Sequence, residues 1–182
     1  MKFHGGIPGW FNFADFYDWV VQNAPDKARF VEVGALFGAS SVYLQSRIVA
    51  SKKDIKLDIV DTFDDKNLSM ESSNLAMPFG GFRKTFDFFT RGRLGDNVRV
   101  CQMPSREHAG ACKPGSLHFV FLDGSHAKLD VLQDISSYLN AMAPGGILGG
   151  HDVDIPDVAQ AVQEAFGTRF VRFGVSCWYV QL

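Results

Sequence analysis

Two polar clusters follow two apolar runs of the sequence, and they hold residue types that suit chemistry. Asp123 and His126 follow the run that ends at residue 122, and His151 and Asp152 follow a glycine-rich run that ends at residue 150. In an open α/β sheet, ligands bind in the crevice beyond the carboxyl ends of the strands, so we expect these four side chains to converge there. Carboxylates suit a hard divalent cation, and imidazole suits proton transfer near neutral pH.

Each cluster also has a purely structural interpretation. Asp123 could cap the turn before the next helix, His126 could be a surface turn residue, and Asp152 could belong to the start of a helix. We favour the functional interpretation because the polar residues all fall at strand ends.

The elements that must position these residues alternate between strand and helix. The apolar spacing predicts helices over residues 12–23, 40–49, 82–94, 105–109, 128–142 and 156–166, and strands over residues 30–34, 56–61, 97–102, 118–122, 145–150, 169–173 and 175–180. The last two strands are separated by one glycine and read as a hairpin. This order predicts an α/β fold whose mostly parallel sheet has one antiparallel strand.

The chain of 182 residues has no internal repeat or linker, so we expect one domain over residues 1–182. Residues 1–28 form an N-terminal arm and helix, and the glycine-rich arm is flexible enough to fold over a cleft, although Trp10 reads first as a packing residue. Residues 64–81 form the least regular stretch, which is either a plain surface loop or a mobile cover for the substrate.

Composition excludes several classes of function. The net charge of −2 offers no basic field for a nucleic-acid partner, and no segment approaches the roughly 18 apolar residues of a membrane span. Cys101, Cys112 and Cys177 are odd in number and widely spaced, which fits neither a disulfide framework nor a CxxC metal site. We therefore expect a cytoplasmic protein with reduced thiols, and the sequence leaves homo-oligomerisation open.

The first strand leads into a glycine loop. Gly34 and Gly38 give the spacing GxxxG, and Leu36 stands where a dinucleotide fingerprint needs its second glycine, so a ligand without a pyrophosphate fits better. Asp61 ends the next strand, where a carboxylate can accept hydrogen bonds from both ribose hydroxyls. Close packing and turn capping are the structural alternatives, but the two signals in this order favour an adenosyl ligand.

With these residues the chain resembles the class I S-adenosylmethionine-dependent methyltransferases. The motifs that carry the resemblance are residues 31–34 with Gly38, Asp61, residues 97–100 leading to Ser105, and residues 144–146. Residues 121–126, followed by a helix and His151-Asp152, are similar to a branch of small metal-assisted O-methyltransferases related to macrolide-sugar methyltransferases and cephalosporin-hydroxylase-type proteins. The resemblance implies a Rossmann-like three-layer sandwich with a seven-stranded sheet and a reversed final strand.

The resemblance also implies roles for individual residues. Those expected to bind S-adenosylmethionine are Glu32, Gly34, Gly38 and Ser41 at the methionine end, Asp61 at the ribose, Thr62, Phe63 and Ser105 around the adenine, and Asp123. Asp123 and Asp152 would ligate a divalent metal, Mg²⁺ or Mn²⁺, and His126 would be the general base. Related enzymes often carry an acidic residue where this chain has His151, and a nitrogen ligand there would shift the preference toward Mn²⁺ or another transition metal.

The leading hypothesis is a metal-assisted O-methyltransferase that acts on a hydroxylated small molecule such as a sugar. Methyl transfer is an in-line displacement, so the enzyme must align an oxygen nucleophile and remove its proton. Three alternatives stay open at this point. They are a metal-independent methyltransferase that uses His126 or His151 alone, a non-catalytic module that binds an adenosyl ligand, and a dehydrogenase, which the missing glycine disfavours.

Overall fold

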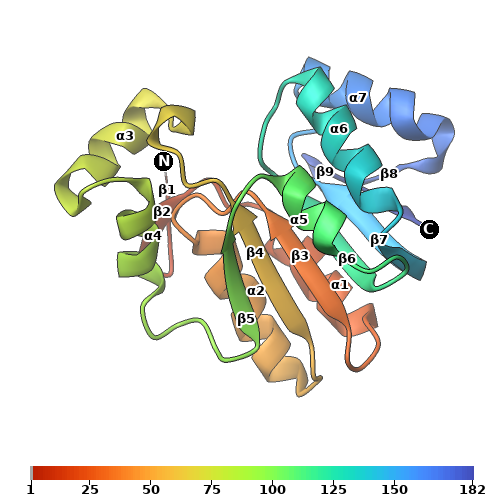
Figure 1. Ribbon diagram of the computed structural model, residues 1–182, viewed down its shortest axis with the longest axis horizontal. Helices are drawn as coiled ribbons and strands as arrows, with labels where there is room; N and C mark the ends of the chain where they lie inside the picture. The colour runs from red at the N-terminus through yellow and green to blue at the C-terminus, as the bar shows by residue number, and fades with distance from the viewer. Residues whose placement is uncertain (1) are drawn as a thin grey trace.

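The computed structural model describes residues 2–182, and its centre is a seven-stranded sheet (Figure 1). In spatial order the strands are β5 (Val98–Gln102), β4 (Lys56–Asp61), β3 (Arg29–Val33), β6 (Leu117–Leu122), β7 (Met142–Gly150), β9 (Cys177–Gln181) and β8 (Val171–Phe173). The first five are parallel, and β9 runs antiparallel to both of its neighbours. The predicted sheet with one reversed strand from a terminal hairpin is confirmed.

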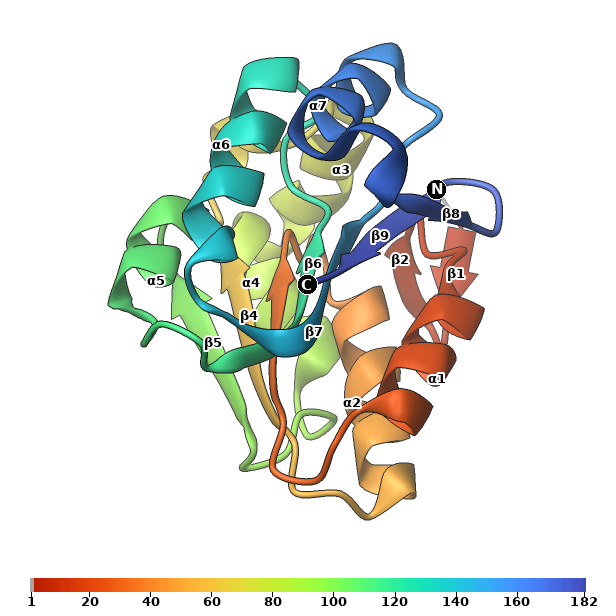
Figure 2. The same ribbon diagram turned by 90° about the vertical axis from the view of Figure 1, so that its right-hand side faces the viewer.

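Helices cover both faces of the sheet, which gives the expected three layers (Figures 1 and 2). One face packs against α1 (Ala14–Asn23), α2 (Ala39–Ser51) and α4 (Phe82–Thr90), and the other against α5 (Ser105–Ala111), α6 (Lys128–Leu139) and α7 (Pro156–Phe166). Side chains of a strand alternate between the two faces, so Phe119 and Phe121 of β6 enter one core while Val120 and Leu122 enter the other. Two apolar cores therefore hold the sheet rigid beneath the edge at which the predicted site residues lie.

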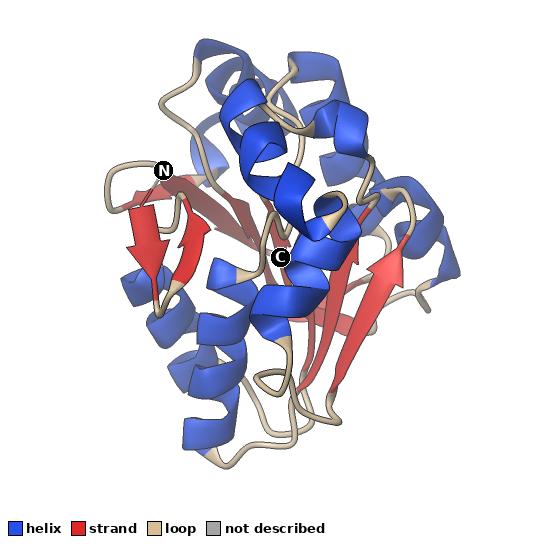
Figure 3. Ribbon diagram, turned by 90° about the vertical axis from the view of Figure 1, so that its left-hand side faces the viewer, coloured by secondary structure: helices blue, strands red, loops and turns tan. Residues whose placement is uncertain are grey.

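The N-terminal arm forms a separate two-stranded hairpin of β1 (Lys2–His4) and β2 (Ile7–Gly9), visible in Figure 3 apart from the main sheet. Arg93 Nη1 donates a hydrogen bond to the Gly5 carbonyl oxygen at 2.8 Å, which ties the hairpin to the chain after α4. The following helix begins at Ala14 rather than at residue 12. Asn12 therefore lies outside the helix, and its side chain contacts His151 instead.

Residues 64–81 are more regular than the sequence interpretation allowed. They contain the short helices η1 (Asp65–Asn67), α3 (Met70–Ala76) and η2 (Met77–Phe79). Ser69 caps α3, because its Oγ accepts a hydrogen bond from the Ser72 backbone at 3.2 Å. The prediction of an irregular loop was wrong because polar caps and turns interrupt helices that are too short to show a clear apolar period.

The sequence Pro-Gly-Gly at residues 144–146 lies inside a strand, whereas the sequence predicts a helix over residues 128–142 and a strand that begins only at residue 145. Helix α6 ends at Leu139 and β7 already begins at Met142, so this tripeptide lies within β7, where the pairing with β6 shifts register. Met142 continues the helical spacing in the sequence, yet in the fold it pairs with Leu117 of β6. None of the helices within residues 2–182 is both long and apolar enough to cross a membrane.

Candidate active site

Three site residues stand one position beyond three neighbouring strands, and each is fixed by one more backbone hydrogen bond of the sheet. The N–H of Gly34 donates to β4 at 2.9 Å, that of Asp123 to β3 at 2.8 Å, and that of His151 to β6 at 3.1 Å. The side chains therefore project from a rigid edge rather than from free loops. The structure brings Asp123, His126, His151 and Asp152 together, as the sequence predicts.

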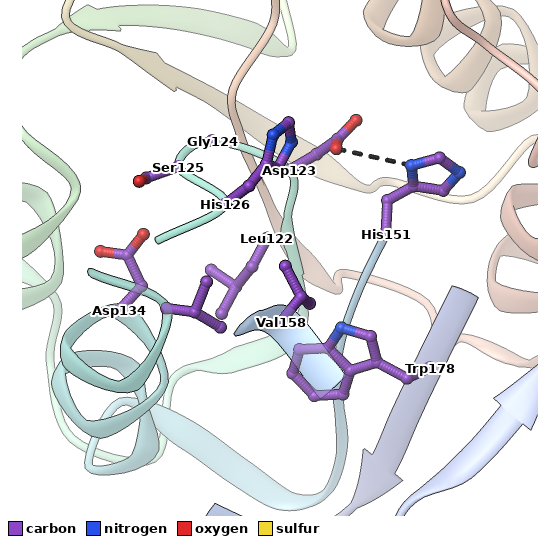
Figure 4. A pocket seen from close by; sticks show the side chains of 10 residues that line it. Leu122, Asp123, Gly124, Ser125, His126, Asp134, His151, Val158 and Trp178 are labelled. Atoms are coloured by element: carbon purple, nitrogen blue, oxygen red, sulfur yellow. Dashed lines mark ion pairs between the residues drawn. The ribbon is translucent and has the colours of Figure 1, made fainter. Parts of the chain in front are cut away.

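Asp152 is bracketed by two imidazoles. His126 Nε2 lies 2.8 Å from Asp152 Oδ2, and His151 Nδ1 lies 3.0 Å from Asp152 Oδ1. His151 Nδ1 is also 3.7 Å from Asp123 Oδ1, the ion pair drawn in Figure 4. Ligand atoms of Asp123, His126 and Asp152 all lie within 4.8 Å of one another. This spacing allows the three side chains to share one bound cation.

The pKa values of the two carboxylates in the cluster are shifted in opposite directions. Burial, together with the nearby charge of Asp152, raises the pKa of Asp123 well above its usual range. Burial also acts to raise the pKa of Asp152, but the hydrogen bonds from His126 and His151 outweigh it and hold that pKa well below its usual range. The same hydrogen bond to Asp152 raises the pKa of His126. Asp152 is thus the charged partner of both histidines.

His151 is held in a fixed orientation by the segment that precedes α1. Its side chain is only 8% exposed, its Nε2 lies 2.8 Å from Asn12 Oδ1, and its ring lies 4.8 Å from the ring of Phe13. Sequence reasoning assigned Asn12 to the helix as a cap, whereas the cap position is Phe13 and carries no side-chain hydrogen bond. No local signal could identify the contact, because Asn12 and His151 are 139 positions apart.

A cleft of about 740 Å³ opens beside the cluster on the side of β4. Asp61, Thr62, Ser105 and Asp123 line it, as the resemblance implies for the cofactor. Residues that the sequence interpretation missed also line it, among them Leu68, Ser72, Phe82, Met103 and Asp134.

Asp61 is fixed at the floor of this cleft by the backbone. Its Oδ2 accepts a hydrogen bond from the Ala35 N–H and its Oδ1 accepts one from the Phe63 N–H, both at 2.9 Å. The carboxylate also lines the cleft, where it can accept hydrogen bonds from ribose hydroxyls.

Gly34 lets two strand ends approach each other. Its φ is +86°, and a Cβ placed on it would lie 2.1 Å from the Asp123 carbonyl oxygen and 2.9 Å from Gly124 Cα. Both of these neighbours are backbone atoms that cannot rotate away. A glycine is therefore required here for the Asp123 loop to close over the end of β3.

Four residues assigned to cofactor binding lie behind the cleft wall. Glu32 is buried, where it accepts hydrogen bonds from Tyr17 Oη at 2.8 Å and from Ser41 Oγ. Gly38 faces α4, where an added Cβ would come within 2.3 Å of a side chain. Phe63 is buried beneath Phe82, which lines the cleft in its place. Direct contact of Glu32, Gly38, Ser41 and Phe63 with a cofactor stays a prediction, and the geometry gives them a supporting position.

A second cleft of about 420 Å³ adjoins the first. Its walls come from the N-terminal segment, from the glycine loop after β3 together with the start of α2 (residues 34–37, 39 and 40), from the ends of β6 and β7, and from the turn before β9. They include Trp10, Asn12, Asp152, Asp154 and Ser176. Trp10, Leu36, Asp123 and His126 line both clefts. Trp10 is 52% exposed, so this side chain is a wall of the site rather than part of a core.

Comparison with known families identifies the class of protein to which the chain belongs. A family model described as a methyltransferase domain matches residues 31–153. The chain belongs to this methyltransferase family. The match confirms the resemblance to the S-adenosylmethionine-dependent methyltransferases and favours it over the dehydrogenase alternative. No curated protein matches the sequence significantly.

Solved structures of two O-methyltransferases and of one further protein show the same fold. The O-methyltransferase NovP has a TM-score of 0.67 and 14% identity, covering 92% of this chain and 78% of NovP. CalS11, a TDP-rhamnose 3'-O-methyltransferase, has a TM-score of 0.62 and 11% identity, covering 92% and 76%. Cofactor-bound Rv0187 from MTB has a TM-score of 0.63 and 14% identity, covering 96% and 83%. At these identities the likeness establishes the methyltransferase fold.

Proposed function

We propose that this methyltransferase transfers a methyl group from S-adenosylmethionine to a hydroxyl group of a small molecule, with the help of a divalent cation. The observation that carries the proposal is that two adjoining clefts meet at Asp123 and His126. One cleft has a carboxylate suited to a ribose, and the other has an acid–base cluster suited to an acceptor hydroxyl. The similarity to the O-methyltransferases NovP and CalS11 supports oxygen as the acceptor atom, and the similarity to CalS11, a TDP-rhamnose 3'-O-methyltransferase, supports a sugar.

The cleft of about 740 Å³, here called the donor cleft, has polar and apolar residues that suit the polar and apolar parts of S-adenosylmethionine. Asp61 would hold the ribose hydroxyls, and Thr62, Phe82 and Ser105 would border the base. When bound, S-adenosylmethionine would supply a sulfonium methyl group, which passes to the acceptor oxygen by in-line displacement with S-adenosylhomocysteine as the leaving group. The protein's part is therefore alignment, and the rigid strand ends around Asp123 provide it.

His126 is the group placed to take the proton of the acceptor hydroxyl. Asp152 Oδ2 accepts the Nε2–H of His126 at 2.8 Å, which leaves Nδ1 of the neutral ring as the base. The side chain of His126 is 53% exposed and borders both clefts, so an acceptor can reach it. Asp152 orients the ring and stabilises its protonated form.

The residues present fit a divalent cation. Two carboxylates, those of Asp123 and Asp152, lie with imidazole nitrogens in one cluster, a donor set that Mg²⁺ and Mn²⁺ both accept. The raised pKa of Asp123 reflects a buried carboxylate beside another negative charge, which a cation would relieve. Asp123 and Asp152 would hold the ion, and its contribution would be to lower the pKa of the acceptor hydroxyl as a Lewis acid.

Calorimetry with S-adenosylhomocysteine, with and without Mg²⁺ or Mn²⁺, tests the donor and metal sites together. Methyl transfer to a panel of nucleotide sugars and phenols then tests the reaction. We expect Asp123→Asn to lower turnover by about 100-fold or more, since it removes a charged ligand at the junction of the clefts. Asp157→Asn is the matched control, because Asp157 is exposed in the first turn of α7 and lines neither cleft.

The outcomes separate the alternatives. Turnover that a chelator leaves unchanged would favour the metal-independent enzyme. Binding of S-adenosylhomocysteine without turnover, unchanged in Asp123→Asn, would favour a binding module. Failure to bind S-adenosylhomocysteine with or without either cation would overturn the proposal.

A further inference from the structure

We propose that Asn12 is a positioning residue that makes His151 a third protein ligand of the cation site, and that this nitrogen ligand favours Mn²⁺ over Mg²⁺. The inference rests on the divalent cation of the proposed function. It concerns a residue of the N-terminal segment, outside residues 31–153 that match the family model. The segment thus contributes to the chemistry of a site built by the sheet.

The first step of the argument is the orientation of the His151 ring. Asn12 Oδ1 lies 2.8 Å from His151 Nε2 and is an acceptor, so it selects the form of the ring that carries a proton on Nε2. Phe13 packs beside the ring at 4.8 Å, and the side chain is almost fully buried. With Nε2 committed to Asn12, Nδ1 faces the two carboxylates and donates to Asp152 in the absence of metal. A bound cation would take the place of that proton, which would leave to solvent.

The second step is the spacing of the donor atoms. His151 Nδ1 lies 3.0 Å from Asp152 Oδ1 and 3.7 Å from Asp123 Oδ1. For metal bonds of about 2.1 Å, ligand atoms at right angles are about 3.0 Å apart and those at 120° are about 3.6 Å apart. His151 Nδ1 therefore stands at a distance from each of these carboxylate oxygens that fits two ligands of one cation.

The third step is the chemistry of the hydrogen bond to Asn12. Histidine ligands of metals commonly donate their other ring N–H to a carbonyl or carboxylate oxygen, which fixes the ring and raises the basicity of the ligating nitrogen. Asn12 supplies such an oxygen. Since Mg²⁺ prefers oxygen ligands and transition metals accept imidazole, the set of two carboxylates and one imidazole favours Mn²⁺ over Mg²⁺.

The test measures the affinity of the purified full chain for Mn²⁺ and for Mg²⁺ by calorimetry, with Mn²⁺ binding checked by electron paramagnetic resonance. We expect Asn12→Ala to weaken Mn²⁺ binding by about 10- to 100-fold and to lower the ratio of Mn²⁺ to Mg²⁺ affinity. Asn12→Asp keeps an acceptor oxygen and should restore most of the affinity. Asn23→Ala is the matched control, since the Asn23 side chain bonds only locally to the Trp19 carbonyl oxygen at 2.8 Å.

A second readout follows the ring itself. Nitrogen-15 NMR of the Mg²⁺-loaded protein, with His151 assigned through His151→Gln, should show a proton on Nε2 and none on Nδ1. In Asn12→Ala this pattern should become a mixture of tautomers. Binding of S-adenosylhomocysteine without metal should be unchanged, which shows that the variant is folded.

Equal Mn²⁺ affinity in the wild-type chain and in Asn12→Ala would overturn the inference while leaving the proposed function intact. A wild-type chain that binds neither cation would overturn the inference as well, together with the metal assistance in the proposed function. Methyl transfer in that protein would still establish the metal-independent reaction. The two failures are therefore distinguishable.

Discussion

Replacement of Gly34 by alanine probes the close approach on which the site depends. The new Cβ would lie 2.1 Å from the Asp123 carbonyl oxygen, so the two backbones must separate by about 1.3 Å to reach an ordinary contact of 3.4 Å. The φ of +86° adds left-handed strain of about 1–2 kcal/mol, because alanine disfavours this region. Since the Asp123 loop joins the two clefts, a shift of this size displaces the carboxylate as well.

Two measurements separate strain from displacement. Urea unfolding reports the free energy of unfolding, and calorimetry reports affinity for S-adenosylhomocysteine and for Mn²⁺. We expect Gly34→Ala to lose about 2–5 kcal/mol of stability, with strain and overpacking combined, and at least tenfold in both affinities. Misplacement of a catalytic group by about 1 Å can lower the rate by about 100-fold, so turnover should fall further.

Gly92→Ala is the matched control for this prediction. Gly92 has a φ of +70°, and a Cβ there would meet no atom within 4 Å. This variant should show only the strain of about 1–2 kcal/mol and unchanged affinities. If Gly34→Ala matched Gly92→Ala in stability and in both affinities, the close contact with Asp123 would not be the reason for the glycine.

Three further changes have expected outcomes. Asp58 accepts two hydrogen bonds from Arg99 and one from His108. Burial acts to raise the pKa of Asp58, but these partners outweigh it and lower that pKa. The contribution of Asp58 to the free energy of unfolding is therefore full above the unfolded-state pKa of about 3.9 and is lost as the pH falls below it. Asp58→Asn should therefore lose about 2 kcal/mol at neutral pH and show a flatter decline in acid, measured by urea unfolding across pH. Asp61→Asn should weaken S-adenosylhomocysteine binding at least tenfold by calorimetry, because an amide cannot accept from both backbone donors; affinity equal to wild type would contradict this. Trp10→Ala should raise the acceptor KM several-fold while thermal unfolding stays unchanged, because its exposed ring lines the acceptor cleft; a lowered melting temperature would instead indicate a packing role.

Some elements were predictable because their signals are local. Strand β4 and helix α7 occupy the residues expected, 56–61 and 156–166. The apolar residues Leu57, Ile59 and Val60 mark the strand, and an amphipathic repeat marks the helix. The Pro-Gly-Gly tripeptide was misplaced because its role depends on pairing between β6 and β7 rather than on its own residues. Residues 64–81 were misread because short capped helices carry little periodicity.

The sequence by itself determined the chain order of the seven strands of the main sheet and of the six helices that cover it, and the four residues beyond the strand ends. Parallel strands share an edge, so residues just beyond them must meet once the order of elements is known. Tertiary structure alone decided that Asn12 holds His151, that Trp10 borders both clefts, and that Glu32 is buried behind the wall. These contacts join segments that are far apart in the chain. They are set by the packing between layers, and local residue spacing does not predict them.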